Sequence, residues 1–374
     1  MEIILWTVLG GCACLVLYPY LVFPAILRVL PSKPIARANG YTGRISMLFC
    51  AYNEGQVIAE KLGNIAMLKA RYPDLEVLAF DDGSSDDSCE QLEARPDLVS
   101  VLRGAGRCGK AHGMKRLAAQ AQGDILVFTD ANVLLDEAAL ANLLAWYGDP
   151  DVGGVCGTLK YLGEGVSATA SVGGLYWRLE ERIKAAESRS GNVMGADGSI
   201  FSVRRALYPS FPDTVLDDMT VSMAVVFAGK RLIAVEDVVA YERLVSARSE
   251  EFRRKMRIAA RAFHTHRYLA PQLGRMATID VFKYVSHKLL RWFGGLFLMV
   301  GALALVGLVL SVSWLVGALF LTAVLVVAAM GLRAKSGVLG QSVEIILALI
   351  ATQIGVFRAM RGQVVVTWTP AKSR

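Results

Sequence analysis

Residues 76–86 read Glu-Val-Leu-Ala-Phe-Asp-Asp-Gly-Ser-Ser-Asp, a short apolar run followed directly by acidic and turn-forming residues. An apolar run without polar alternation is typical of a strand that is buried on both faces, as in a parallel sheet. The same pattern recurs at residues 45–54, which end in Ala51-Tyr52-Asn53-Glu54, and at residues 125–132, which end in Thr129-Asp130-Ala131-Asn132.

Strand-like runs alternate with amphipathic segments of helix length through the middle of the chain. The runs lie at 45–50, 76–80, 99–102 and 125–128, and the segments at 55–70, 85–95, 110–120 and 137–146. This alternation predicts an α/β fold with a largely parallel sheet and flanking helices. No repeat or long linker interrupts the pattern, and we interpret residues 43–270 as one domain.

Three carboxylate-bearing turns follow the predicted strands, and ligands of open α/β sheets bind outside the carboxyl ends of the strands. Each turn alone has a simpler explanation, because Asp, Asn, Gly and Ser also form turns and cap helices. A basic loop, Arg107-Cys108-Gly109-Lys110, lies between them and opens a predicted helix. Such a loop suits a phosphate, although it lacks the P-loop pattern, and a solvated basic helix is the alternative. Three turns in register favour a binding site, and Asp130 has the right position to hold Mg²⁺ together with waters and substrate phosphates.

The outer parts of the chain are apolar. Of the 374 residues 54% are hydrophobic and 20% charged, and residues 3–27 and 292–332 contain no charge at all. Both stretches exceed the roughly 20 residues that a membrane-spanning helix needs. We expect a transmembrane helix in residues 1–30, an amphipathic interfacial segment at 271–291, a C-terminal transmembrane region of two to three helices at 292–358 and a basic tail at 359–374. Ser311, Ser313 and Trp314 predict a tight turn within the long apolar stretch.

The sequence is compatible with two interpretations of each of two features in the C-terminal region. The stretch 336–357 either spans the membrane or is re-entrant. Glu344 within it is a candidate functional residue, because ionisable groups in apolar segments are costly, or it only packs against a neighbouring helix.

The charge distribution predicts that the middle domain lies in the cytosol. The net charge is +7, and the basic residues cluster beside the apolar segments, as the positive-inside rule requires of cytosolic flanks. This clustering, without an aromatic-studded basic sheet, argues against nucleic acid as a partner. The six cysteines show no CxxC pair or ligand-like spacing, so we expect them to be reduced and mostly buried.

In this order, the turns resemble motifs of the family 2 glycosyltransferases. The likeness is to the membrane-integrated branch that includes cellulose, chitin and hyaluronan synthases and many bacterial exopolysaccharide transferases. The matching residues are Tyr52-Asn53-Glu54, Asp81-Asp82-Gly83-Ser84, Gly109-Lys110, Asp130-Ala131-Asn132, Gly195-Ala196-Asp197-Gly198 and Leu216-Asp217-Asp218. The resemblance covers residues 45 to about 263 and implies a GT-A fold, a nucleotide-sugar-binding α/β sandwich, attached to transmembrane helices.

The resemblance also implies a role for each matching residue. Asp218 is the catalytic base and Asp217 holds it in place. The donor nucleotide binds at Ala51, Asn53, Glu54, Asp82, Lys110 and Asp130. Arg254, Arg257, Asp197 and Gly198 serve the diphosphate or the acceptor. Asp130 and Asn132 are the expected ligands of Mg²⁺ or Mn²⁺.

The sequence departs from the family pattern at three places. Asn132 replaces an Asp of the metal motif, and Lys115 replaces an Asn that is usual after the Gly-Lys loop. The Q-x-x-R-W signature of processive synthases keeps only Arg257, with Arg254 and Ile258 in place of Gln and Trp. Arg253, Arg257 and Arg261 share one helix face, and a surface helix held to anionic lipid is the alternative reading.

The expected function is inverting transfer of a sugar from a nucleoside-diphosphate sugar, UDP rather than GDP, to a lipid-linked saccharide or growing glycan. The expected location is the cytosolic face of a bacterial inner membrane, in exopolysaccharide or cell-envelope glycan synthesis, with membrane lipids and other polysaccharide-assembly subunits as partners. Trp177, Arg178 and Arg182 line the acceptor path on this hypothesis, although Trp177 also fits a core position. The alternatives are a processive synthase that also translocates its polymer, which the loss of Trp at Ile258 disfavours, and a non-catalytic scaffold.

Overall fold

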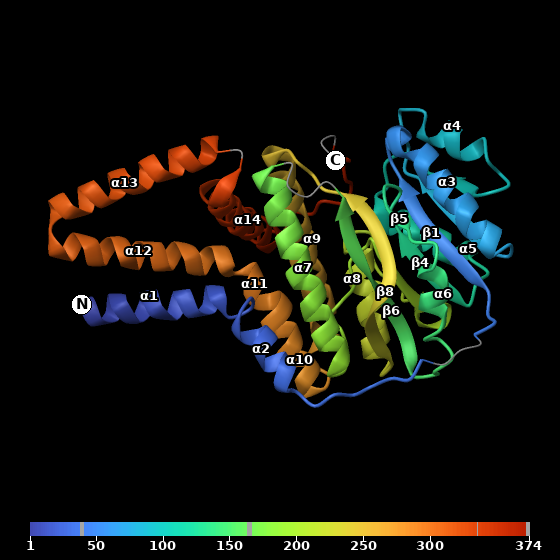
Figure 1. The fold of residues 1–374 in the computed structure, drawn as a ribbon, viewed down its shortest axis with the longest axis horizontal. Helices are drawn as coiled ribbons and strands as arrows, with labels where there is room; N and C mark the ends of the chain where they lie inside the picture. The colour runs from blue at the N-terminus through green and yellow to red at the C-terminus, as the bar shows by residue number, and fades with distance from the viewer. Residues whose placement is uncertain (38–40, 163–166, 335, 372–374) are drawn as a thin grey trace.

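A computed structural model describes residues 1–37, 41–162, 167–334 and 336–371. Figure 1 shows two regions: a twisted sheet with helices on both faces, and a group of helices that extends from one end of it. The chain enters through this helical end, builds the sheet, and returns to the helical end with its last helices.

The described residues form one eight-stranded sheet in the order β3-β2-β1-β4-β7-β6-β8-β5. The strands are β1 (Ile45–Ala51), β2 (Glu76–Asp81), β3 (Ser100–Arg103), β4 (Ile125–Thr129), β5 (Leu134–Leu135), β6 (Val152–Leu162), β7 (Ile200–Arg204) and β8 (Arg231–Arg243). β1, β2, β3 and β4 pair in parallel, as do β6 and β8, whereas β7 and β5 run antiparallel to their neighbours. The predicted, largely parallel α/β fold is confirmed.

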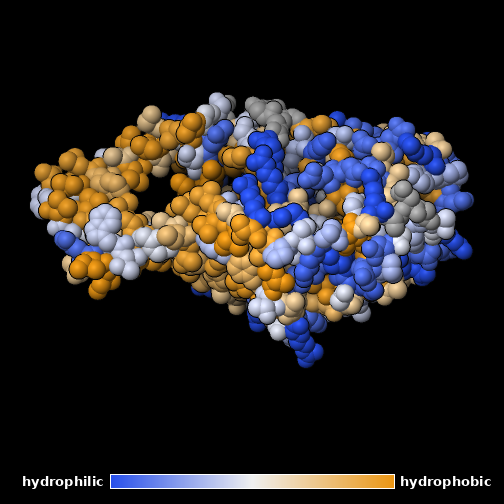
Figure 2. Space-filling model, turned by 60° about the horizontal axis from the view of Figure 1, so that its bottom comes forward, coloured by the Kyte–Doolittle hydropathy of each residue, from blue (hydrophilic) through white to orange (hydrophobic). Residues whose placement is uncertain are grey.

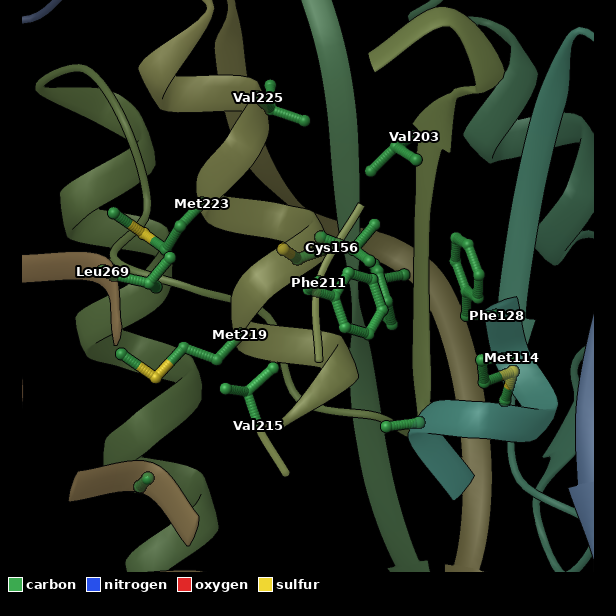
Figure 3. Packing of buried hydrophobic residues seen from close by; sticks show 14 of the residues in the cluster. Met114, Phe128, Cys156, Val203, Phe211, Val215, Met219, Met223, Val225 and Leu269 are labelled. Carbon is green, nitrogen blue, oxygen red and sulfur yellow. The ribbon is translucent and has the colours of Figure 1, made fainter. Parts of the chain in front are cut away.

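Successive strand residues point to opposite faces and enter two separate cores. Met47 and Phe49 pack with helices α3 (Gly55–Arg71), α4 (Ser88–Glu93) and α6 (Ala139–Leu144). Leu48 and Cys50 pack with α5 (Lys110–Gln120), α8 (Asp217–Phe227) and α9 (Arg248–Leu273). Figure 3 shows this second core, in which Phe211 and Cys156 lie between Met219 and Met223 of α8 on one side and Met114 and Phe128 on the other. Both faces are therefore covered, and the carboxyl edge of the strands remains for a ligand.

The helical end contains the apolar segments. α12 (Gly294–Val312), α13 (Trp314–Arg333) and α14 (Gly337–Met360) are the three helices of the described chain that are individually long and apolar enough to cross a membrane. The chain turns between α12 and α13 at Ser313, whose hydroxyl accepts a hydrogen bond from the Leu315 amide at 3.2 Å. Figure 2 shows hydrophobic residues gathered over this end and hydrophilic residues over the sheet end.

The N-terminal apolar stretch differs from the single helix that its composition predicts. It forms α1 (Glu2–Leu17) and α2 (Val22–Val29), which meet at an angle of 57°. Pro19 follows the end of α1, and proline has no amide hydrogen and disfavours helix before it. Phe23 and Leu27 of α2 are buried against Ile183, so α2 packs on the domain.

Helix α7 (Ala168–Arg189) joins the sheet to the helical end, where it packs beside α10 (Thr278–Tyr284), a π-helical turn η2 (Val285–Leu289) and α11 (Leu290–Trp292). A short 3₁₀ turn, η1 (Arg205–Leu207), follows β7. Glu344 of α14 forms an ion pair with Arg248 at 2.5 Å and accepts a hydrogen bond from Thr169 at 3.0 Å. These contacts hold α14 against α9 and α7, which gives Glu344 a packing role.

Candidate active site

The ends of β1 and β2 are joined by side-chain hydrogen bonds. The register that places Ala51 beside Asp81 brings the two following turns together. Asn53 adopts a left-handed backbone conformation, with φ of 51°, and its side-chain oxygen accepts a hydrogen bond from the Ser85 amide at 2.7 Å. The Glu54 amide donates to the Ser88 hydroxyl at 2.7 Å. The turn residues therefore shape this edge of the sheet, and the Glu54 side chain also lines the adjoining cavity.

Asp82 holds the basic loop in place. Its fully buried carboxylate accepts hydrogen bonds from the amides of Cys108, at 2.7 Å, and Gly109, at 2.9 Å, and pairs with Arg107 at 3.4 Å. Gly109 has φ of 92°, a conformation that favours glycine. These groups of the loop already bind the carboxylate oxygens of Asp82. Asp82 therefore supports the loop from behind and fixes the start of α5.

A single cavity of about 1440 Å³ receives the other predicted site residues. Lys110 and Asp130 enter it from α5 and the end of β4, and their charged groups lie 2.5 Å apart. Gly198 lies beside this pair. A methyl group at Gly198 would lie 2.8 Å from the Lys110 nitrogen, 3.4 Å from a carboxylate oxygen of Asp218 and 3.8 Å from one of Asp130. The absence of a side chain at Gly198 therefore leaves the space between these three groups open.

Asp217 and Asp218 form the first turn of α8, where the helix dipole favours negative charge. Asp218 accepts a hydrogen bond from the Met219 amide at 2.6 Å. Burial, and next the charge of Asp217, raise the pKa of Asp218 to about 7, although Lys110 opposes this change. In the described part of the chain, one buried carboxylate oxygen of Asp217 has no hydrogen-bond partner. Asp218 thus has the pKa of a group that takes up a proton near neutral pH.

The arginines of α9 face the cavity. Arg257 lines it and makes no hydrogen bond or ion pair with any described residue. Burial and the neighbouring Arg254 and Arg261 lower the pKa of Arg257 to about 10, which leaves it charged at neutral pH. A half-buried cation without a partner favours an anionic ligand.

Two neighbouring α9 arginines are paired within the protein. Arg254 pairs with Glu251 at 3.5 Å, and buried Arg261 donates to the carbonyl of Val215 at 2.8 Å. Arg261 therefore does not fit the alternative of a surface helix held to anionic lipid, because its side chain is buried against the segment before α8.

The residues expected to hold a metal ion fit a site in which the substrate supplies some of the metal ligands. No cluster of three Asp, Glu, His or Cys ligands occurs among the described residues. Asp130 offers one carboxylate, one third exposed toward the cavity. The amide nitrogen of Asn132 donates to Glu242 at 2.8 Å, which leaves its carbonyl oxygen available. Mg²⁺ commonly binds one or two carboxylates and takes its other ligands from waters and substrate phosphates, and this donor set is compatible with such an ion.

Asp197 also reaches the cavity, but it is neutralised within the protein. Its carboxylate accepts hydrogen bonds from Lys184 at 2.8 Å and from the Ser199 amide at 3.2 Å. Lys184 in turn pairs with Glu181 at 2.9 Å. Asp197 therefore holds the turn before β7 in shape, next to the open position at Gly198.

The sequence pattern missed a C-terminal segment, residues 363–371, that lies against the basic loop. The guanidinium of Arg107 lies 3.3 Å from the centre of the Tyr52 ring and 5.9 Å from that of Trp368, whose carbonyl accepts a hydrogen bond from it. A methyl group at Gly109 would approach the carbonyl oxygen of Val366 to 2.6 Å. The only local signal was a lone Trp in the basic tail, of which residues 372–374 lie outside the described structure.

Comparisons with known proteins find similarity to a glycosyl transferase family and to polysaccharide synthases. Residues 46–210 match Glycosyl transferase family 2. Curated relatives include the poly-beta-1,6-N-acetyl-D-glucosamine synthases of Staphylococcus aureus (strain COL), 30% identical over 132 residues, and of Staphylococcus epidermidis, 30% identical over 98 residues. These matches cover 34% and 25% of this chain but only 31% and 23% of the relatives, so the chain spans less than a third of their length.

A solved structure extends the likeness over nearly the whole fold. The mannosyltransferase PcManGT from Pyrobaculum calidifontis, in complex with GDP-Man and Mn²⁺, superposes with a TM-score of 0.76 over 96% of this chain and 99% of its own. The sequence identity is 23%. At this level of identity the likeness establishes a shared fold, including the helices outside the sheet domain.

Proposed function

We propose that this chain, whose residues 46–210 match Glycosyl transferase family 2, is a glycosyltransferase that transfers a sugar, with inversion, from a UDP-sugar to a hydroxyl of a lipid-linked saccharide or glycan. We place the reaction at the cytosolic face of a bacterial inner membrane, in exopolysaccharide or envelope glycan synthesis. One observation carries the proposal: Asp218, with a pKa of about 7, shares one cavity with Lys110, Asp130 and the unpaired Arg257.

Asp218 acts as the general base in this proposal. A base is most effective when its pKa lies near the working pH. The acceptor oxygen forms a bond to the anomeric carbon while its proton passes to Asp218. The bond between that carbon and the diphosphate breaks, and its electron pair leaves with the nucleoside diphosphate. The charge of Asp217 helps to keep the pKa of Asp218 near neutrality.

In this proposal, positively charged side chains that line the cavity stabilise the leaving diphosphate. Negative charge grows on the diphosphate in the transition state, and fixed positive groups stabilise it there. Arg257 and Lys110 supply such charges from α9 and α5. Asp130 and Asn132 would hold a bound Mg²⁺ or Mn²⁺, which would add charge neutralisation at the diphosphate.

The turn at Ala51, Asn53 and Glu54 and the loop held by Asp82 form the nucleotide end of the site. Both lie at the carboxyl edge of the sheet, where Arg107 lies against Tyr52. In this proposal the loop positions the diphosphate through the amino end of α5, and Asp82 contributes by fixing the loop.

Addition of a single sugar fits the acceptor side of the cavity. Ile258 lines the cavity and is 40% exposed, at the position where processive synthases have a Trp that stacks under the acceptor sugar. The names of the curated relatives support a second candidate, a processive polysaccharide synthase, because they are polymer synthases. A non-catalytic scaffold is the weakest candidate, because Asp130, Lys110 and Asp218 are all intact and lie in one cavity.

The test is release of nucleoside diphosphate by the purified full chain in detergent. A panel of UDP- and GDP-sugars is offered with Mg²⁺ or Mn²⁺, with and without a lipid-linked saccharide. Release that requires the acceptor and stops after one sugar supports the proposal. Polymer formed without added lipid indicates the processive alternative, and no release with any donor contradicts both enzymatic readings.

A further inference from the structure

The turn between β4 and β5 carries Asp130 and Asn132, and a buried lysine of α3 ties its two ends together. The Lys61 ammonium group donates hydrogen bonds to the carbonyl of Val133 at 2.6 Å and to the hydroxyl of Thr129 at 3.5 Å. Thr129 immediately precedes Asp130, and Val133 immediately follows Asn132. The Val133 amide also donates to the carbonyl of Asp130 at 3.2 Å. Lys61 therefore acts on the backbone of the turn from inside the protein.

A second side chain of α3 extends this support to β5. Asn64 lies three positions after Lys61, on the same face of the helix. Its side-chain amide donates to the carbonyl of Leu135 at 2.8 Å and accepts from the amide of Leu135 at 2.9 Å. Buried isoleucines of α3 pack into the sheet core, and β5 pairs with β8. The segment 129–135 is thus held to α3 near both of its ends (Figure 1).

The burial of Lys61 has an energetic cost. Its side chain is completely buried, and its two hydrogen-bond partners are uncharged. The ring of Phe49 lies 5.4 Å from the ammonium nitrogen. Burial lowers the pKa of Lys61 to about 7, whereas the charge of Asp130 raises it. An apolar side chain of similar length would fill this space without that cost, so packing alone does not account for a lysine here.

We propose that Lys61, assisted by Asn64, is a positioning residue for the cation site, because it holds in place the turn whose Asp130 and Asn132 would bind a divalent ion. Lys61 lies outside the cavity lining and acts through the backbone of the turn. Groups that are already held in their binding arrangement avoid the cost of being ordered when the ligand binds. This inference rests on the proposed function and adds to it the residues that prepare the cation site.

The test measures binding of Mn²⁺ and does not require turnover. The full chain in detergent is titrated with Mn²⁺ at a fixed concentration of UDP or, in parallel, GDP, and free Mn²⁺ is measured by electron paramagnetic resonance. Lys61→Met keeps a long unbranched side chain and removes the hydrogen-bond donor. It is expected to weaken Mn²⁺ binding about ten- to hundredfold, as for other residues that orient metal ligands.

Lys69→Met is the matched control. Lys69 also belongs to α3 and also donates to a backbone carbonyl, that of Asp97 at 3.0 Å. This control is expected to bind Mn²⁺ as the wild-type chain does. In Lys61→Met, loss of a hydrogen bond and removal of a buried charge have opposite effects on stability, so we expect a similar melting temperature. If Lys61→Met does not fold, Asn64→Ala is the second variant, and it is expected to weaken Mn²⁺ binding several-fold.

Two results of the titration would overturn the inference. Unchanged Mn²⁺ binding in folded Lys61→Met or, where that variant does not fold, in Asn64→Ala would leave these side chains with a purely structural role. Tighter Mn²⁺ binding in Lys61→Met would show that the charge of Lys61 opposes the cation more than its hydrogen bonds support the turn.

Kinetics separate this inference from the proposed function. With an active preparation, Lys61→Met is expected to raise the Mn²⁺ concentration for half-maximal rate about tenfold and to leave the KM for the acceptor within about twofold. If Lys61→Met weakens Mn²⁺ binding as expected but the wild-type chain turns over no donor, the proposed function fails and this inference stands. If the wild-type chain transfers sugar but binds no Mn²⁺, this inference fails and the proposed function stands.

Discussion

The ammonium group of Lys110 lies 2.5 Å from the carboxylate of Asp130, within the cavity that also holds Asp218. Asp130, and next the neighbouring carboxylates of α8, keep the pKa of Lys110 high despite its burial, so the lysine remains charged. Lys110 therefore neutralises Asp130 before a donor binds, and a divalent cation has to compete with it for this carboxylate.

Asp130→Asn is expected to lower turnover by at least about a hundredfold, because the side chain loses the charge that a cation and Lys110 both use. It should also raise the Mn²⁺ concentration needed for half-maximal rate. Nucleoside diphosphate release at a series of Mn²⁺ concentrations measures both quantities. Asp74→Asn, at an exposed aspartate, is the control. Retained turnover with an unchanged Mn²⁺ response would remove Asp130 from the metal site.

Asp218→Asn is expected to reduce transfer by about a hundred- to ten-thousandfold, the contribution of general base catalysis. The change keeps the size of the side chain and removes its ability to take a proton, so the melting temperature should change little. Product formation and thermal unfolding of the same preparation give the comparison. Wild-type rates in this variant would assign the base to another residue.

The pH dependence of kcat/KM should show the ionisation of Asp218. Because the base acts in its deprotonated form and its pKa is about 7, activity should rise with pH and level off above neutrality. Asp217→Asn removes a charge that raises this pKa, so the inflection should move to lower pH. A profile whose inflection stays in place in Asp217→Asn would contradict the coupling between the two carboxylates.

Gly198→Ala is expected to lower kcat about ten- to hundredfold while the protein stays folded. The new methyl group would lie 2.8 Å from the end of the flexible Lys110 side chain, which can shift only by leaving Asp130. Gly63→Ala in α3 is the matched control, because no described atom lies within 4 Å of its new methyl group. That control should be active and, by helix propensity, more stable by up to about 1 kcal/mol.

Trp368→Ala is expected to raise the KM for the donor several-fold with a smaller effect on kcat. Trp368 and Tyr52 both contact Arg107, which pairs with Asp82 in the loop. A double-mutant cycle with Arg107→Ala should show a coupling of about 0.5–3 kcal/mol in donor binding, as for residues in contact. Additive effects would mean that the C-terminal segment acts independently of the loop.

Local patterns predicted most of the sheet domain, because a buried parallel strand is a short apolar run and its carboxyl end lies at the ligand edge. The turns at Asn53 and Asp130 lie where the pattern predicts. The pattern could not assign Asp82 to the loop, since its hydrogen bonds to Cys108 and Gly109 depend on how that loop folds back.

Long-range contacts explain what the sequence did not reveal. Trp368 reaches Arg107 across 261 positions of the chain, and His287 reaches Glu180 across 107. Neither pair has a periodicity or a spacing motif, because each depends on the packing of whole helices. The bend at Pro19 is different: the proline is visible in the sequence, but a hydropathy window averages over it.

The short segment from Met360, at the end of α14, to Trp368 has a mechanical consequence. α14 is apolar enough to sit in a bilayer, and Trp368 lies against the loop that begins α5. Helices adjust their tilt to the thickness of the surrounding lipid. We therefore expect the thickness of a bilayer around α14 to affect the geometry around Arg107, and rates measured in a detergent micelle to differ from rates measured in lipid of matched thickness.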